Sequence, residues 1–261
     1  MRIVFLTQDD PLYILPFFEE FFRQQPQEVE VLAVLTCKTM GERGRLRLLR
    51  ELLYLYGPMG LTRLLFRVAG SRVLSLLPAP REARRFHSIG QICRAFGVRH
   101  SLIGNPNHDE HYRQIAALSP DLLVSIACPY ILKQKLLDVP PLGCINMHHA
   151  PLPRYKGMMP TFWQMYHGER TVGVTIHQMA ARVDEGAALL QEQIEIEQDE
   201  SLDHLIRRGK RHGARCMSRV LRALAQREVK TLPLDQERSS YFTFPTSDEM
   251  KEFRRRGFRA I

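Results

Sequence analysis

Short apolar runs and amphipathic stretches alternate along the first half of the chain. The apolar, mostly β-branched runs predict strands over residues 2–7, 28–36, 98–103 and 121–127. The amphipathic stretches between them predict helices over residues 12–23, 88–96, 111–118 and 131–137. Strands that alternate with helices indicate parallel βαβ units. We therefore expect an α/β fold, a Rossmann-like, open, twisted and mostly parallel sheet with helices on both faces.

The next apolar run, residues 142–147, ends in polar groups. Asn146 and His148 are two positions apart, so their side chains point to the same face of an extended strand. Pro151 and Pro153 then stop the strand, because proline lacks an N–H group and fixes φ. In open parallel sheets, ligands bind beyond the carboxyl ends of the strands. This strand end is therefore a candidate active site.

The residue types suggest which chemistry this site performs. The Asn146 amide can donate to a developing oxyanion, and His148 can carry a proton near neutral pH. Asp184, just before Gly186, can orient the imidazole and favour its protonated form. No Ser or Cys stands in a nucleophile-elbow context, which favours direct transfer of an acyl-level carbon to an amine through a tetrahedral intermediate. The alternative is a polar strand end that satisfies backbone groups of the loop.

A series of motifs in fixed order carries a family resemblance. They are Asn146-Met147-His148, Ala150-Pro151-Leu152-Pro153, Tyr155-Lys156-Gly157, Pro160-Thr161-Phe162-Trp163, Gly168-Glu169, Gly173-Val174-Thr175 and Asp184-Glu185-Gly186. In this order they resemble the folate-dependent formyltransferase family, most closely over residues 120–197. The resemblance implies that Asn146, His148 and Asp184 are the catalytic triad and that 10-formyltetrahydrofolate is the formyl donor. The chain departs from the family at Ala150-Pro151, where Ser-Leu is common, and at His149, where Gly or Pro is frequent.

The same resemblance implies a folate pocket built from three segments. These are Tyr130, Ile131 and Leu132; Ala150, Pro151, Leu152 and Pro153; and Ala180, Ala181, Arg182 and Val183. For the apolar members, the alternative is core packing. No Gly-x-Gly-x-x-Gly follows the first strand, which disfavours a dinucleotide cofactor. No residue spacing predicts a metal site, and His167 and His177 are interpreted as structural.

Residues 41–85 form a basic insert. They contain ten arginines, no lysine and three glutamates, a net charge of +7 out of +9 for the whole chain. Leucines alternate with these arginines, and Gly57-Pro58 separates a first helix from a second over residues 61–77. The insert could be a helical hairpin packed on the sheet with solvated arginines. It could also lie on an anionic membrane surface, or contact RNA or a second subunit.

Composition adds bounds on class and compartment. The 261 residues are 44% hydrophobic and 25% charged, as in an ordinary globular protein. The first apolar run is too short for a signal peptide or a membrane span. The five cysteines are odd in number and include no Cys-x-x-Cys pair, which favours a reducing compartment. We expect a cytoplasmic protein, with peripheral membrane contact through residues 41–85 as the alternative to the packed hairpin.

The second half of the chain predicts two more strands and a long C-terminal helix. Residues 171–177 and 189–196 predict an antiparallel extension of the sheet, and Ser201 can cap a helix over residues 202–225. We expect a catalytic domain over residues 1–200 and a C-terminal helix with a short tail over residues 201–261. This second part leaves no room for the full β-barrel that methionyl-tRNA formyltransferases carry.

The tail favours one class of substrate. Residues 241–258 look more like those of sugar N-formyltransferases, so we expect an amino sugar, linked to a nucleotide or a lipid. The alternatives are methionyl-tRNA or another small-metabolite amine as the acceptor, or a folate-binding or membrane-recruited scaffold without activity. A homodimer is a further expectation from the family and the long helix, whereas a nucleic-acid partner is not expected.

Overall fold

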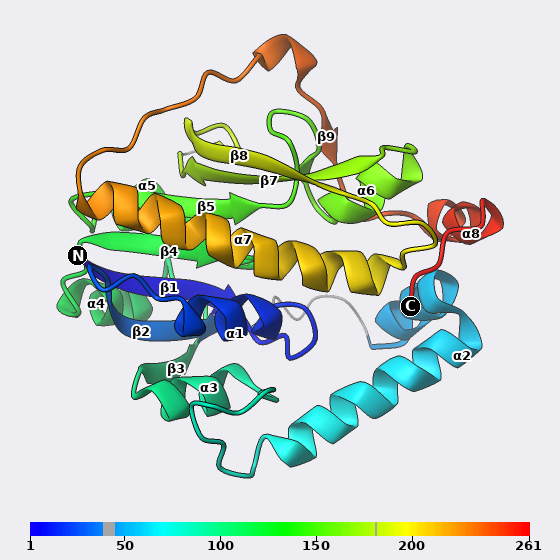
Figure 1. Cartoon of the computed structure of the whole chain (residues 1–261), viewed down its shortest axis with the longest axis horizontal. Helices are drawn as coiled ribbons and strands as arrows, with labels where there is room; N and C mark the ends of the chain where they lie inside the picture. The colour runs from blue at the N-terminus through cyan, green and yellow to red at the C-terminus, as the bar shows by residue number, and fades with distance from the viewer. Residues whose placement is uncertain (39–44, 181) are drawn as a thin grey trace.

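The computed structural model describes residues 1–38, 45–180 and 182–261, apart from the side chains of residues 45–48. Its main sheet runs in the order β3-β2-β1-β4-β5-β7-β8 (Figure 1). The strands are β1 (Arg2–Gln8), β2 (Glu30–Cys37), β3 (Arg99–Ile103), β4 (Leu122–Ile126), β5 (Cys144–His148), β7 (Thr171–Gln178) and β8 (Ala188–Glu195). The first five are parallel, whereas β7 and β8 extend the sheet in antiparallel fashion. The predicted Rossmann-like sheet and its antiparallel extension are confirmed.

Helices cover both faces of the sheet, as expected. On one face, α1 (Leu15–Arg23), α3 (Ile89–Phe96) and α7 (Leu202–Ala225) bury their apolar stripes against β1, β4 and β5. On the other face, α4 (Asp109–Ala117) and α5 (Gln134–Leu137) pack on β1 and β2. The alternation of side chains along β1 explains both layers, because Phe5 faces one cluster and Leu6 the other.

The helix ends follow local capping chemistry. The Ser201 side chain accepts the His204 N–H, so α7 begins where the sequence predicts. The helix predicted from residue 12 begins later, at Leu15. The Asp10 carboxylate accepts the N–H groups of Leu12 and Tyr13 at 2.8 and 2.9 Å and holds a turn before the helix.

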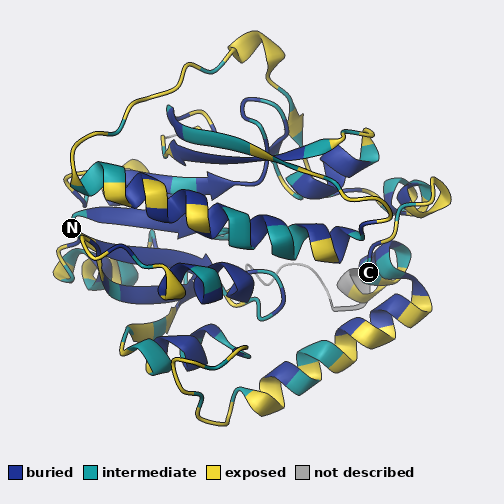
Figure 2. Cartoon of the chain, viewed as in Figure 1, coloured by how far each residue is buried: buried dark blue, intermediate teal, exposed yellow. Residues whose placement is uncertain are grey.

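The basic insert is a long kinked helix, α2 (Arg45–Leu74). The kink lies at Gly57, whose φ of 67° and ψ of 174° leave helical geometry just before Pro58, as the sequence predicts. Residues 41–44 of the insert lie outside the described residues. Leu55 is buried with α6 (Pro160–Tyr166) and α8 (Ser247–Arg255) in a third apolar cluster. Figures 1 and 2 show that the rest of α2 extends along one side of the molecule and carries many exposed positions.

The tail returns to the strand end that carries Asn146. After a 3-10 turn at Gln236–Arg238, β9 (Tyr241–Phe242) pairs in parallel with the short β6 (Lys156–Gly157). Trp163 donates its indole N–H to the Thr243 carbonyl at 2.9 Å, which anchors the tail to α6. In the described part of the chain, no helix combines the length and the apolar character needed to cross a bilayer.

Candidate active site

The three predicted catalytic residues lie together at the carboxyl end of β5. His148 Nδ1 is 3.5 Å from Asp184 Oδ2, and the Gly157 N–H donates to the same oxygen at 3.1 Å. Asp184 itself stands at a left-handed φ of 55° in the loop between β7 and β8. Gly186 lets this loop close, because a Cβ there would lie 1.7 Å from the Gln178 carbonyl oxygen.

His177 connects the third residue to this group. The Asn146 amide nitrogen is 3.2 Å from His177 Nε2, which is in turn 3.5 Å from Asp184 Oδ1. His177 Nδ1 donates to the Gln178 carbonyl at 2.8 Å, so Nε2 accepts from Asn146 in the neutral ring. The structural interpretation of His177 is therefore incomplete, because its ring contacts two of the predicted catalytic residues. Antiparallel pairing of β5 with β7 places it opposite Asn146, a register that could have revealed it.

The charge state of the site differs from the sequence prediction. Burial lowers the pKa of His148, against the opposing effect of the Asp184 carboxylate. For Asp184, burial acts to raise the pKa, but His148, His177 and the Gly157 N–H outweigh it and bring the pKa to about 2. The pair in the free site is thus an ionised carboxylate beside a neutral imidazole, and the expected standing charge on His148 is not supported.

The backbone selects which nitrogen of His148 can react. Nε2 donates to the Tyr155 carbonyl at 2.8 Å, so the neutral ring carries its proton there. Nδ1 faces Asp184 with a free lone pair. A proton arriving at Nδ1 would form an imidazolium next to a carboxylate, which stabilises the charge.

The predicted folate segments border the same strand ends. Met179, just before Ala180, packs in one apolar cluster with Tyr130 and Leu132, so the first and third segments meet there. Ile131 and Val183 expose 65% and 37% of their surface.

The remaining members of these segments divide by burial. Ala150, Leu152 and Pro153 are buried, which leaves chiefly their backbone to contact a ligand. Pro151 is half-buried, Ala180 and Arg182 are exposed, and Ala181 lies outside the described residues.

Two further basic side chains lie beside the triad on the α7 side. Lys210 is only 7% exposed and has no hydrogen bond or ion pair with the described residues. Burial lowers its pKa to about 8, and Asp10 opposes that effect. His149 is also buried, and its Nε2 has no hydrogen-bond partner in the described structure. A Cβ on Gly209 would lie 3.3 Å from His149 Nδ1, so α7 passes directly over this ring.

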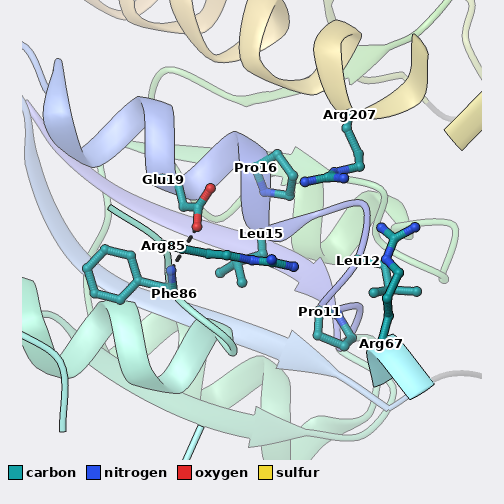
Figure 3. Close-up of a pocket in the computed structure, with 9 residues that line it drawn as sticks. All are labelled: Pro11, Leu12, Leu15, Pro16, Glu19, Arg67, Arg85, Phe86 and Arg207. Atoms are coloured by element: carbon teal, nitrogen blue, oxygen red, sulfur yellow. Dashed lines mark hydrogen bonds between the residues drawn. The ribbon is translucent and has the colours of Figure 1, made fainter. Parts of the chain in front are cut away.

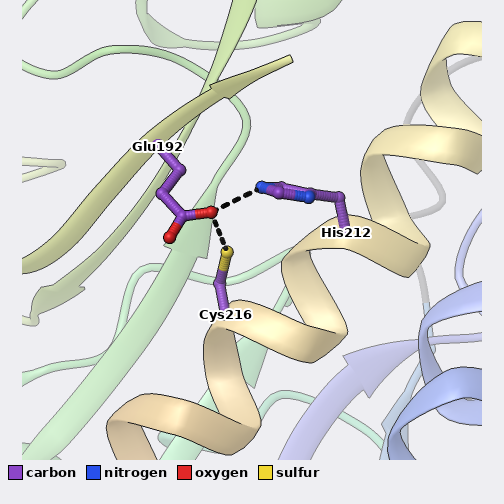
Figure 4. A group of neighbouring side chains, drawn as sticks. All are labelled: Glu192, His212 and Cys216. Atoms are coloured by element: carbon purple, nitrogen blue, oxygen red, sulfur yellow. Dashed lines mark hydrogen bonds and ion pairs between the residues drawn. The ribbon is translucent and has the colours of Figure 1, made fainter.

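Elsewhere in the described part of the chain, two groups of acidic, histidine or cysteine side chains have the residue types of metal ligands. In one, Glu192 Oε2 lies 2.9 Å from His212 Nε2 and 3.6 Å from Cys216 Sγ (Figure 4). Arg219 pairs with the same carboxylate. The second group, Glu197, Glu200 and His204, is likewise bridged by Arg208, which pairs with Glu200 at 2.6 Å. We interpret both as ion-pair networks, because an arginine already neutralises a carboxylate in each.

Comparison with known proteins is consistent with this geometry. The Formyl transferase family matches residues 92–221, which include Asn146, His148 and Asp184. The methionyl-tRNA formyltransferase of Kosmotoga olearia is 30% identical over 166 residues, covering 64% of this chain and 51% of the relative. That of Syntrophus aciditrophicus is 42% identical over 124 residues, covering 48% of this chain and 40% of the relative. The chain thus spans about half the length of these curated relatives.

Solved structures share the fold over most of this chain. Phosphoribosylglycinamide formyltransferase from Anaplasma phagocytophilum matches with a TM-score of 0.61 at 16% identity, over 94% of this chain and 99% of that one. A sugar N-formyltransferase from a Shewanella species matches with a TM-score of 0.59 at 16% identity, over 97% of this chain and 87% of that one. The sequence match over residues 92–221 thus identifies a Formyl transferase domain that contains Asn146, His148 and Asp184. The solved structures, at 16% identity, show that the fold is shared.

Proposed function

We propose that the chain transfers the formyl group of 10-formyltetrahydrofolate to the amine of an amino sugar linked to a nucleotide or a lipid. The observation that carries this proposal is the group around Asp184. There an ionised carboxylate, a neutral imidazole with a free Nδ1 and the Asn146 amide meet at the end of β5. These are the groups needed to accept a proton from an amine and to stabilise an oxyanion.

The residues divide the work as follows. When bound, 10-formyltetrahydrofolate supplies the formyl carbon that the acceptor amine attacks. Asn146 uses one amide N–H toward His177, and its second N–H is available for the oxygen that becomes negative. His148 Nδ1 accepts the proton that the amine loses as its C–N bond forms, and can return it to the donor nitrogen that leaves when the formyl carbon's bond to the donor breaks. Asp184 stabilises the resulting imidazolium, and the Tyr155 carbonyl keeps the ring in this tautomer.

The folate segments support this donor. Exposed apolar side chains at Ile131 and Val183 suit the faces of a flat ring. The Helicobacter canadensis N-formyltransferase, a structural neighbour with a TM-score of 0.57, is described in complex with folinic acid and dTDP-3-aminofucose. At 13% identity that likeness concerns the fold alone. An amino-sugar acceptor is therefore a proposal that also draws on the tail, residues 241–258.

The test uses purified protein, 10-formyltetrahydrofolate and a panel of amino-sugar nucleotides. Methionyl-tRNA is tested in parallel because the curated relatives are named methionyl-tRNA formyltransferases. Tetrahydrofolate release and product mass are followed together. One added formyl group on a sugar supports the proposal. Formylation of methionyl-tRNA alone would show that the acceptor is not an amino sugar, and would still support the proposed formyl transfer. Folate binding without turnover on any acceptor would favour a scaffold.

The exposed side of α2 supports peripheral membrane contact. Large apolar side chains lie open to solvent there and just after the helix, with Phe66 79%, Val73 65% and Leu76 82% exposed. Exposed arginines at positions 63 and 72 stand among them. Apolar and cationic groups on one helix suit an anionic lipid surface. Phe66→Ser together with Leu76→Ser should abolish co-sedimentation with anionic vesicles. If the double variant instead changes only the oligomeric state, the face is a dimer interface.

A further inference from the structure

A small pocket away from the triad is lined by three arginines. Arg67 of α2, Arg85 of the loop after α2 and Arg207 of α7 point into it from three sides, over the start of α1 (Figure 3). Pro11, Leu12, Leu15, Pro16, Glu19 and Phe86 complete the lining. Three guanidinium groups from distant parts of the sequence thus meet at one partly enclosed place. The enclosed space measures only about 10 Å³, so an anion larger than a water would bind at its open mouth.

Too few carboxylates lie near these arginines to balance them. Arg67 pairs with Asp203 at 2.9 Å, and Arg207 shares the same carboxylate at 3.8 Å. A fourth arginine, Arg211, lies 3.8 Å from Glu19, which also accepts the Phe86 N–H at 2.9 Å. Arg85 has no hydrogen bond or ion pair among the described residues. Among the described residues, these four arginines therefore share two carboxylates.

Arg207 carries the clearest sign of a missing partner. Its Nε is buried and has no hydrogen-bond acceptor in the described structure. Burial is the main cause that lowers the pKa of this guanidinium, and the nearby Arg67, Arg211 and Arg85 act in the same direction. The Asp203 carboxylate acts to raise this pKa. Arginine does not deprotonate in proteins. The repulsion is instead relieved when an anion binds between the guanidinium groups.

We propose that Arg67, Arg85 and Arg207 bind the diphosphate group of the amine acceptor. A diphosphate brings two or more negative charges and several acceptor oxygens, which match the surplus charge and the fork-shaped donors. Arg207 and Lys210 are three residues apart on α7 and therefore share one side of the helix. Lys210 lies close enough to His148 and His149 to affect the pKa of both rings. This side of α7 thus connects the pocket to the triad, and the inference rests on the proposed function for the identity of the acceptor.

Binding can be measured without any formyl chemistry. Inorganic pyrophosphate is titrated into the full chain by calorimetry at low ionic strength, with no folate present. The wild-type protein should bind one pyrophosphate saturably. Arg85→Gln should weaken this binding about tenfold or more, because it removes a charge-assisted contact. The substitution breaks no interaction of the described residues, so we expect an unchanged melting temperature.

Arg50→Gln is the matched control. It removes the same charge, but Arg50 is exposed and does not line the pocket. Its affinity for pyrophosphate should stay within about twofold of wild type. Absence of pyrophosphate binding to the wild-type protein, or equal weakening in both variants, would overturn the proposal.

Two probes separate the sources of a diphosphate. Uridine diphosphate and geranyl diphosphate are each titrated against pyrophosphate-loaded protein. Tighter binding of the nucleotide indicates a nucleotide carrier, and tighter binding of the prenyl compound indicates a lipid carrier. Failure of both to displace pyrophosphate would overturn the assignment to an acceptor. These binding measurements involve no turnover, so the two proposals can fail separately. Absence of diphosphate binding would overturn the pocket proposal without affecting the proposed formyl transfer. Diphosphate binding by an enzyme without formyltransferase activity would support the pocket proposal and contradict the proposed function.

Discussion

The Asp184 group and the arginine pocket handle charge in opposite ways. Around Asp184, one buried carboxylate accepts the Gly157 N–H and faces the neutral rings of two imidazoles, so the site holds a negative charge that a proton arriving at His148 would balance. In the pocket, the guanidinium groups outnumber the carboxylates. The first site lacks one positive charge until His148 takes up a proton, whereas the proposed role of the second is to bind a negatively charged group.

This difference fits two separate tasks. A proton acceptor must be neutral and ready before the amine arrives, and stabilisation of its charged form must already be in place. A pocket that selects a substrate gains affinity by leaving charge unmatched until the right partner binds. The comparison therefore predicts that changes around Asp184 lower turnover, whereas changes in the pocket alter the affinity for the acceptor.

The largest expected effect comes from Asp184→Asn. The variant keeps the size of the side chain, and Asn tolerates the left-handed φ of 55° at this position. Without the carboxylate, the imidazolium of His148 loses its stabilising charge, and kcat should fall about 100- to 10,000-fold. Turnover in the formylation assay measures the loss. Asp248→Asn, an exposed position on α8, should be silent. Near-normal kcat in Asp184→Asn would contradict the role of this group.

A glycine pair compares how the two regions tolerate added volume. Gly186→Ala would place a Cβ 1.7 Å from the Gln178 carbonyl oxygen and should lower the free energy of unfolding by about 3 kcal/mol. In Gly70→Ala, the new Cβ on α2 has no neighbouring atom within 4 Å. This variant should raise the free energy of unfolding by about 0.5–1 kcal/mol, because alanine favours the helix. Urea denaturation measures both. Equal stabilities would show that the Asp184 loop is not as tightly closed as described.

The pH dependence of turnover tests the charge of His148. Because burial lowers the pKa of this ring, its neutral form dominates at pH 7. Turnover should therefore be constant near neutrality and fall up to about tenfold per unit below the pKa of His148, which lies under the usual 6.5. The neutral ring of the folded state also makes the protein less stable as the pH falls through 6.5, so folding is checked at each pH. Loss of turnover with rising pH would indicate that the charged ring is the active form.

The smallest effect is that of salt. Raising the ionic strength from 0.01 to about 0.15 M shortens the Debye length from about 30 to about 8 Å. The KM for a diphosphate-linked acceptor should rise a few-fold, because the pocket acts through uncompensated charge. The kcat should stay nearly constant, because the Asp184 group is buried and internally paired. A kcat that changes with salt while KM stays constant would contradict the assignment of acceptor affinity to the pocket and of turnover to the Asp184 group.

The sequence predicted the layers of the fold well because they depend on local patterns. Periodicity located the strands and helices to within a few residues, and Gly57-Pro58 marked the kink. Motif order grouped Asn146, His148 and Asp184 in one candidate site, and the structure brings their side chains together, while their catalytic role stays a prediction. The late start of α1 was missed, because it depends on which N–H groups the Asp10 side chain accepts.

What the sequence did not predict depends on contacts between distant segments. His177 joins the site only through its register against Asn146. The lowered pKa of His148 depends on how deeply the ring is buried. Arg67 and Arg85 could be recognised as part of a basic insert, but their meeting with Arg207 requires the fold.

The pairing of β6 with β9 has a consequence for biosynthesis. The N–H groups of Lys156 and Met158 donate to the carbonyls of Ser240 and Phe242 at 2.9 Å each. The same short segment supplies the Tyr155 carbonyl to His148 and the Gly157 N–H to Asp184. Its final conformation therefore depends on residues translated long after the triad itself. On the ribosome, the sheet can assemble early, but the nascent chain should gain its activity only after residues 240–242 have emerged.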